Sequence, residues 1–295
     1  MSSKRIIGGL LPGLVLVLVL GAVAAPGAAV AAPESRYYLS LGDSIAAGWQ
    51  PDPVTGQSRF TNQGYPDQLY RSLREAVPGL AHQKMGCPGE TTVSMIQGPG
   101  NCYPGTSQLQ AAVAFIAAHP GQLAFITIDV GVNDILSCLS AADPAACATT
   151  KIGTQVVPNL ATILGTLRAA AGNAVPIVAM NYYNPYLAAW IEGIPPDGPT
   201  GRGMAQLTTQ LAAGLNGAEG QVYAAFQVPV ADVYGAFHTT EWRMARGRPV
   251  NVQFVCRLTW ACSGPPVGLN IHPKRAGHAL IALAFEGILE GYGIG

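Results

Sequence analysis

The sequence predicts an α/β protein in which a central parallel sheet lies between two layers of helices. Short, continuously apolar runs at residues 37–41, 123–129 and 175–181 are typical of strands buried on both faces of a parallel sheet. Segments with helical spacing separate these runs, and this alternation predicts βαβ units in a three-layer α/β/α sandwich. Hydrophobic residues make up 49% of the chain, so a large buried core can form.

The individual elements follow in order along the chain. The first strand is expected at 37–41 and ends at Gly42, where the chain can turn tightly. Two weaker strand signals lie elsewhere, at 80–85 and 226–232. Helices are expected at residues 65–77, 107–119, 156–171, 204–215 and 276–292. In the first of these helices, Leu69, Leu73 and Val77 recur every four residues and form one apolar face.

The N-terminus has the pattern of a secretory signal. Lys4 and Arg5 form a short basic region, residues 10–20 are apolar, and Ala-Val-Ala at 29–31 reads as a cleavage site. Residues 22–24 offer a second cleavage site. We therefore expect residues 1–31 to be a signal peptide and the mature protein to be secreted.

An uncleaved membrane anchor is the alternative reading of this segment, because its apolar stretch approaches the length that spans a bilayer. Pro12, Gly13 and Pro26 break the helix and disfavour that reading. No long polar linker divides the rest of the chain, so residues 32–295 are expected to form a single domain, which we expect to be monomeric.

The composition excludes some classes of partner. The formal net charge is zero and only 11% of residues are charged. A nucleic-acid partner is not expected, because phosphate binding depends on clustered cations and the sequence has none beyond the N-terminal pair. No Walker loop, Gly-x-Gly-x-x-Gly or Cys-x-x-Cys motif occurs, so neither a cofactor nor a metal site is implied.

The chain has 6 cysteines, and all of them follow the signal segment. An even number in an exported chain indicates disulfides, although several connectivities are open. The order of the cysteines favours three short local loops, closed by Cys87–Cys102, Cys138–Cys147 and Cys256–Cys262.

Four short blocks carry residues suited to chemistry. Ser44 lies in a Gly-Asp-Ser run directly after the first strand. Gly89 lies in a loop that begins at a cysteine, and Asn133 follows the strand at 123–129. His272, in an Asn-Ile-His-Pro run, precedes the last helix. Ligands in such folds bind at the carboxyl ends of the strands, where the first and third of these blocks are expected.

Together these blocks, in this order and spacing, resemble the SGNH (or GDSL) hydrolase family, and in particular its secreted actinobacterial branch. The resemblance spans essentially the whole mature chain. It implies a flavodoxin-like fold, with Ser44 as nucleophile and His272 as general base. It also implies an oxyanion hole made by the backbone N–H of Ser44, Gly89 and the side chain of Asn133.

One position departs from the family pattern. The family places an aspartate three residues before the histidine, where this sequence has Leu269. Asn270, two residues before His272, cannot be a carboxylate. We therefore predict that a backbone carbonyl, that of Leu269, orients the His272 ring through its Nδ1–H.

These residues predict a secreted esterase or lipase that cleaves carboxylic esters through an acyl-serine intermediate. The expected substrate is a small-molecule or lipid ester, and the apolar segment at 186–194 is a candidate wall or lid for an acyl pocket, with transient contact to a lipid surface. A carbohydrate O-acetyl esterase is the nearest alternative, for which Trp49, Trp242 and Trp260 could form a sugar platform. A secreted binding module without activity is a more distant one.

Overall fold

The computed structural model describes residues 1–2, 8–9, 36–191 and 201–295. The predicted signal segment and residues 192–194 of the candidate lid therefore lie, apart from four residues near the N-terminus, outside the described residues. No helix in the described part of the chain is long and apolar enough to cross a membrane.

A five-stranded parallel sheet forms the centre of the domain, with the strand order β4-β1-β5-β6-β7. The strands are β1 (Arg36–Gly42), β4 (Leu80–Lys84), β5 (Leu123–Asp129), β6 (Ile177–Met180) and β7 (Val230–Ala231). All four pairings between neighbours are parallel, from β1 with β4 to β6 with β7. The predicted three-layer α/β/α architecture is confirmed.

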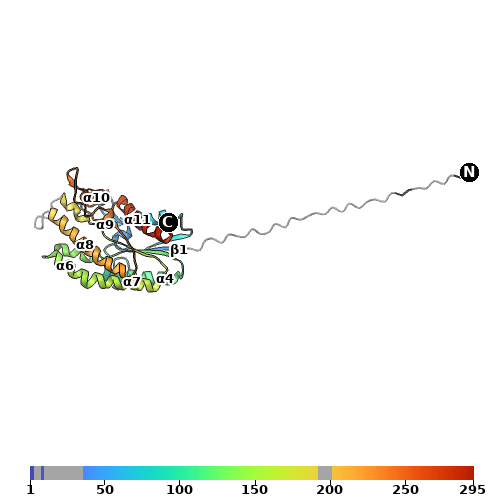
Figure 1. Cartoon of the computed structure of the whole chain (residues 1–295), viewed down its shortest axis with the longest axis horizontal. Coiled ribbons are helices and arrows are strands. Elements are labelled where there is room, and N and C mark those ends of the chain that lie inside the picture. The colour runs from blue at the N-terminus through green and yellow to red at the C-terminus, as the bar shows by residue number, and fades with distance from the viewer. Residues whose placement is uncertain (3–7, 10–35, 192–200) are drawn as a thin grey trace. The chain divides into compact units, whose positions relative to one another are not determined.

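The helices cover both faces of this sheet (Figure 1). The larger helices are α2 (Tyr65–Leu73), α4 (Gln108–Ala118), α6 (Pro144–Lys151), α7 (Val157–Ala171), α8 (Gly201–Ala225), α10 (Val250–Leu258) and α11 (Arg275–Leu289). Shorter elements are α1 (Ser44–Ala47), α3 (Thr92–Gln97), α5 (Val132–Leu136), α9 (Val233–Ala236), η1 (Ser137–Ser140), η2 (Ile152–Val156), η3 (Pro185–Trp190) and η4 (Glu290–Tyr292). Two small hairpins join β2 (Trp49–Pro51) to β3 (Ser58–Phe60) and β8 (Met244–Ala245) to β9 (Arg248–Pro249).

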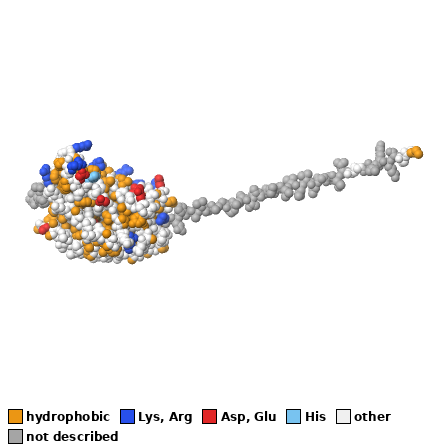
Figure 2. Space-filling model, viewed as in Figure 1, with side chains coloured by type: hydrophobic (Ala, Val, Ile, Leu, Met, Phe, Trp, Pro, Cys, Tyr) orange, Lys and Arg blue, Asp and Glu red, His pale blue; other side chains and the backbone are white. Residues whose placement is uncertain are grey.

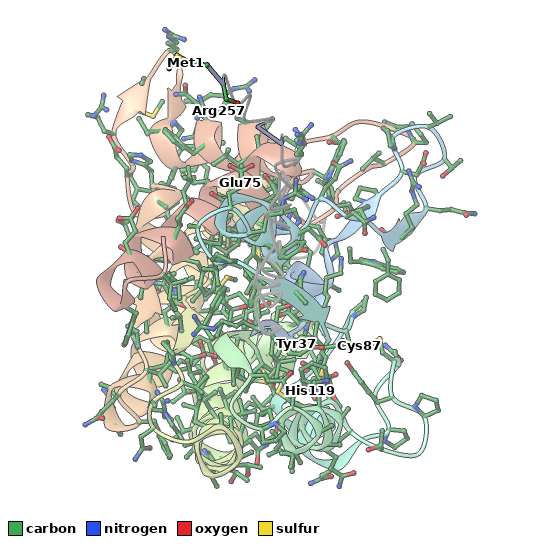
Figure 3. The ribbon with its side chains drawn as sticks, turned by 90° about the vertical axis from the view of Figure 1, so that its right-hand side faces the viewer. Met1, Tyr37, Glu75, Cys87, His119 and Arg257 are labelled. Atoms are coloured by element: carbon green, nitrogen blue, oxygen red, sulfur yellow. A yellow bond between two sulfur atoms is a disulfide. The ribbon has the colours of Figure 1, made fainter. Side chains whose placement is uncertain are left out.

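Alternate residues of the strands fill two separate cores. Tyr38 and Phe125 belong to the core beneath α2 and α11, whereas Leu39 and Ile126 belong to the core beneath α4 and α7. This alternation is the period of two that a strand imposes on its side chains. Figure 3 shows Tyr37 beside His119 at the end of α4, and their rings lie 4.5 Å apart.

Some elements differ from the predicted ranges. The strand expected at 226–232 is only two residues long, because residues 226–227 form the turn that ends α8 and Gln227 has φ +54°. The helix expected to end at 215 continues to Ala225 as α8. No helix was predicted directly before residue 156. In the structure α6 and a π-helical turn run into α7 without a break. The helix α10, amphipathic but only nine residues long, was also missed.

Three disulfides close local loops: Cys87–Cys102, Cys138–Cys147 and Cys256–Cys262. These are the pairs that the order of the cysteines favours, and no cysteine of the described chain is free. The first of them closes the loop that carries Gly89, and Figure 3 shows Cys87 at the start of that loop. Charged side chains are sparse on the face visible in Figure 2, as the composition requires.

Candidate active site

Ser44 lies where the central strand β1 turns into the short helix α1. Gly42 makes this turn with φ +140°, and a Cβ there would collide with the backbone oxygen and the carboxyl group of Asp129. Asp43 then caps the helix, accepting a hydrogen bond from Ile45 N at 2.8 Å. Ser44 is therefore the first helical residue, and its backbone N–H has no partner within the helix.

His272 lies in the loop between α10 and α11. Its backbone oxygen accepts a hydrogen bond from Trp260 N at 3.0 Å, and the preceding carbonyl of Ile271 accepts one from Tyr183 Oη at 2.7 Å. These bonds fix the loop at both sides of the ring. Burial lowers the pKa of His272 to about 4, so the imidazole is neutral near pH 7.

The partner of the His272 ring differs from the predicted one. Nδ1 is 2.8 Å from the side-chain oxygen Oδ1 of Asn270, and not bonded to the carbonyl of Leu269, whose side chain is 50% exposed. The Asn270 side chain folds back over its own loop, because Oδ1 also accepts the backbone N–H of His272 at 3.1 Å. This turn places the amide oxygen beside the ring.

This contact decides which nitrogen of His272 carries the proton. An amide oxygen can only accept a hydrogen bond, so Nδ1 must donate. In the neutral ring Nε2 is then the free base, which is the form that a general base requires. The orienting group is neutral, as predicted, but it is a side chain that the sequence analysis set aside for not being a carboxylate.

Asn133 lies at the second position of α5, directly after β5. Its Nδ2 donates to the carbonyl oxygen of Glu90 at 2.9 Å, which places the amide beside the turn formed by Pro88 and Gly89. Gly89 has φ +79°, a conformation that favours glycine. The amide has a second N–H that this bond leaves free for another acceptor.

One cavity brings together three of the four predicted blocks. Ser44, Asn133 and His272 all line it, and Gly89 lies one residue from the carbonyl that anchors Asn133. No direct hydrogen bond joins the side chains of Ser44 and His272 in the described structure. Such bonds are often long in an enzyme without substrate. None of Trp49, Trp242 and Trp260 lines this cavity.

Most of the remaining cavity wall is apolar. The volume of the cavity is about 70 Å³. The apolar side chains come from α1, α5, η1, η3, α8 and the His272 loop: Ile45, Val132, Ile135, Leu136, Leu139, Pro185, Leu211, Ala212, Leu215 and Ile271. The predicted segment at 186–194 contributes Tyr186 to this wall.

Gln108 is a residue of the site that the sequence analysis missed. Its buried side chain accepts from Gly42 N at 2.7 Å and donates to Gly42 O at 2.9 Å, so it clamps the residue that starts the turn to Ser44. The same Nε2 donates to Glu90 Oε2 at 2.9 Å, beside Gly89. No sequence signal marked it, because it lies in the first turn of an ordinary helix.

Asp134 joins two of the loops at the site. It lies inside α5, and its carboxylate accepts from Thr92 N at 2.9 Å and from Thr92 Oγ1 at 2.7 Å. It therefore ties the start of α3, which follows the Gly89 loop, to the helix that carries Asn133. His278 lies on the last helix, α11, and its Nδ1 accepts a hydrogen bond from Tyr65 N at 3.1 Å.

Buried carboxyl groups lie beneath these loops. Burial raises the pKa of Asp43 to about 6 and the pKa of Asp129 well above its ordinary value. Tyrosine hydroxyls bond to both, from Tyr182 to Asp43 Oδ2 at 3.0 Å and from Tyr65 to Asp129 Oδ1 at 2.7 Å. A neutral form of at least one of these groups is favoured, since two buried charges would repel each other.

Glu219 is the third of these carboxyl groups. It is fully buried on α8, and both of its oxygens lack a hydrogen-bond partner in the described structure. Its Oε1 occupies the space that a Cβ on Gly131 would fill. Burial raises the pKa of Glu219 well above its ordinary value, so the neutral acid is favoured there. Within the described residues, no three His, Cys, Asp or Glu side chains are grouped to hold a metal ion.

Comparison with known proteins places this arrangement in a family. The family model described as GDSL-like lipase/acylhydrolase matches residues 40–280. No curated protein matches the sequence.

Solved structures share the fold at low sequence identity. A phospholipase A1 from Streptomyces albidoflavus is similar with 18% identity and a TM-score of 0.54, covering 87% of this chain and 99% of its own. An extracellular lipase from Streptomyces rimosus has 17% identity and a TM-score of 0.55, covering 87% and 99%. A carbohydrate acetylesterase from Sinorhizobium meliloti has 15% identity and a TM-score of 0.51, covering 88% and 100%. From the family match, which spans most of the chain, it follows that the protein belongs to the GDSL-like lipase/acylhydrolase family.

Proposed function

We propose that this chain is a secreted serine hydrolase that cleaves carboxylic esters with apolar acyl groups. One observation carries the proposal: Ser44, Asn133 and a His272 ring with a free Nε2 line a single cavity whose other walls are mostly apolar. A serine hydroxyl is a weak nucleophile until a neighbouring base removes its proton, and His272 is the base available.

In the proposed reaction, Ser44 Oγ attacks the ester carbonyl while His272 Nε2 takes its proton. The oxyanion of the tetrahedral intermediate accepts hydrogen bonds from the N–H groups of Ser44 and Gly89 and from the second N–H of Asn133. His272 then returns the proton to the leaving alcohol, which leaves an acyl-serine that water hydrolyses by the same steps in reverse order. Each donor of such a hole contributes about 3–4 kcal/mol to lowering the barrier.

His272 works in this scheme without a carboxylate beside its Nδ1. The Asn270 amide oxygen holds the ring and selects its tautomer, but a neutral group stabilises the imidazolium less than a carboxylate would. Burial lowers the pKa of His272 to about 4. The base is then available over a wide pH range, while proton transfer to it is less favourable.

The apolar wall favours an acyl chain over a sugar acetate. Leu136, Leu211 and Leu215 line the cavity, which gives hydrocarbon a surface away from water. Carbohydrate O-acetyl esters remain the rival substrate, and the structural likeness to a carbohydrate acetylesterase covers fold alone.

Reaction with a fluorophosphonate tests the nucleophile. The purified mature protein should be labelled at Ser44, and p-nitrophenyl esters should be hydrolysed, whereas Ser44→Ala should lose both. A ratio of octanoate to acetate hydrolysis above one supports the acyl pocket, and activity confined to acetate would favour the deacetylase. A folded protein that is neither labelled nor active would instead support the binding module.

Export is the second part of the proposal. Three disulfides suit an oxidising compartment, and the basic, apolar and small-residue regions before residue 32 have the order of a signal peptide. N-terminal sequencing of protein recovered from culture medium should begin after Ala31 or Ala24. Recovery only from cell membranes with Met1 retained would favour the anchor.

We further propose that the secreted protein is a monomer that contacts lipid surfaces transiently. Two large hydrophobic side chains, Phe60 and Leu269, are 55% and 50% exposed, and the Ser58–Asn270 contact at 3.4 Å links the segments that carry them. Light scattering should give the mass of one chain. Flotation with phosphatidylcholine vesicles should recover a fraction of the protein that decreases in Phe60→Ser.

A further inference from the structure

A second apolar cavity adjoins the first. Both are lined by Leu139, Pro185, Tyr186 and Ile271, so the two cavities meet at these side chains. The second cavity alone is lined by Ala188, Ala189, Met204, Ala261, Leu269 and Asn270. Its volume is about 250 Å³, larger than the roughly 70 Å³ of the first. Nothing in the proposed chemistry so far uses it.

The side chains that line the second cavity suit a hydrocarbon chain and do not suit a polar part of a substrate. Among its walls, the polar atoms belong only to Tyr186, to the Asn270 amide and to the backbone, and none of its lining side chains is charged. The Asn270 side chain is already engaged, because its oxygen accepts from His272 and its nitrogen lies 3.4 Å from Ser58 Oγ. A sugar or a charged headgroup would therefore find few hydrogen-bond partners there.

The position of the second cavity relates it to one side of the ester bond. It is lined by Asn270 and Ile271, the two residues that precede His272. In acyl transfer the general base later protonates the departing oxygen, so the leaving alcohol lies next to the histidine. Leu211 and Leu215 on α8 line only the first cavity. The acyl chain and the alcohol therefore have separate apolar surfaces.

We propose that the second cavity binds the hydrocarbon part of the ester's alcohol, so that the substrates carry alkyl chains on both sides of the scissile bond. This inference rests on the proposed ester hydrolysis at Ser44 and adds the class of alcohol to it. Medium-chain alkyl esters and acylglycerols with a remaining acyl chain both have the required form. Acetylated sugars do not.

Two isomeric esters can distinguish the contributions of the two cavities. Hexyl acetate and ethyl hexanoate have the same formula and similar hydrophobicity, but the long chain lies on the alcohol side in one and on the acyl side in the other. Met204 lines only the second cavity and Leu211 only the first, and both lie partly exposed on α8. Met204→Asp and Leu211→Asp therefore place the same short charge in one cavity or the other.

We expect Met204→Asp to lower kcat/KM for hexyl acetate about tenfold more than for ethyl hexanoate, a factor typical of losing one or two methylene contacts. Leu211→Asp should show the opposite preference. Leu283→Asp, at a 61% exposed position on α11, controls for the added charge and should alter neither ratio. Met204→Ser serves as the milder variant if the aspartate prevents folding.

Equal losses on both esters in Met204→Asp and Met204→Ser, or a larger loss on ethyl hexanoate, would overturn the assignment of the second cavity. In that case ester hydrolysis by the wild type and its labelling at Ser44 would still stand. A wild-type protein that hydrolyses neither ester and is not labelled would instead refute the proposed function itself.

Discussion

Asn270 Oδ1 accepts a hydrogen bond from His272 Nδ1 at 2.8 Å, so a neutral amide stands where a catalytic histidine commonly has a carboxylate. The contact is local, two residues along one loop. It needs no distant residue to bring the acceptor to the ring. The group that orients His272 is thus supplied by the same turn that presents it.

Asn270→Asp should move the acidic limb of the kcat/KM profile to higher pH. In the wild type the base is lost only as pH falls through about 4, the lowered pKa of His272. A carboxylate in hydrogen-bond contact favours the imidazolium and should raise that pKa by about 1–3 units. Esterase assays between pH 3 and pH 8 measure the limb.

Leu269→Asp is the matched control for this change. Leu269 is half exposed, and the Nδ1 of His272 is already hydrogen-bonded to Asn270. Leu269→Asp should therefore shift the acidic limb of the kcat/KM profile much less. A larger shift in Leu269→Asp than in Asn270→Asp would show that the predicted position of the family's aspartate, and not Asn270, governs the ring.

Gly131→Ala should remove most of the activity and destabilise the protein. Gly131 has φ +134°, and an added Cβ would overlap Glu219 Oε1. The loop that carries Asn133 must then move, which removes a donor worth about 10²–10³ in kcat. Esterase assays and urea unfolding measure both effects.

The companion variant Glu219→Ala separates the clash from the backbone strain. In the double variant, stability should recover partly, because the overlap is removed while the unfavourable φ remains. Strictly additive losses of stability would mean that Glu219 does not limit the space at Gly131.

Glu219→Gln should stabilise the protein relative to the wild type as pH rises. The pKa of Glu219 is raised above 4.5 by burial, so the wild type has the full stability of the neutral acid only below that pH and loses it as pH rises through the folded-state pKa. The loss is about 1.4 kcal/mol for each pH unit in this window, and a glutamine does not share it.

Urea unfolding at pH 4 and pH 8 measures how the stability difference between Glu219→Gln and the wild type changes with pH. The difference in unfolding free energy between Glu219→Gln and the wild type should grow in favour of the variant at pH 8. Glu286→Gln, on α11 and hydrogen-bonded to the exposed Ser72, is the surface control and should show no comparable growth. A variant that becomes relatively weaker at pH 8 would mean that Glu219 is ionised in the folded protein.

Gln108→Met should lower both stability and kcat. Methionine has a similar shape but cannot bond to Gly42 or Glu90, so a buried N–H and a buried carboxyl oxygen lose their partner. Each such loss costs about 1–3 kcal/mol, and the turn that presents Ser44 loses its clamp. Gln110→Met, two residues on at an exposed position, is the control and should retain both properties.

The sequence predicts most of the architecture because its signals are local. Continuous apolar runs mark strands buried on both faces, and β1, β4, β5 and β6 lie close to their predicted ranges. The strand at 226–232 was overestimated because its first residues form the turn that ends α8, where Gln227 has φ +54°, and only Val230 and Ala231 pair in the sheet.

The sequence also predicts three residues that line the first cavity, since Ser44, Asn133 and His272 each directly follow or precede a regular element. The tertiary structure alone decides how they are supported. Gln108 reaches Gly42 across 66 residues and Asp134 reaches Thr92 across 42, and side chains so far apart have no sequence pattern that joins them. The second cavity likewise exists only where η3, α8 and the His272 loop pack together. Such packing depends on shape and burial, which a linear pattern does not record.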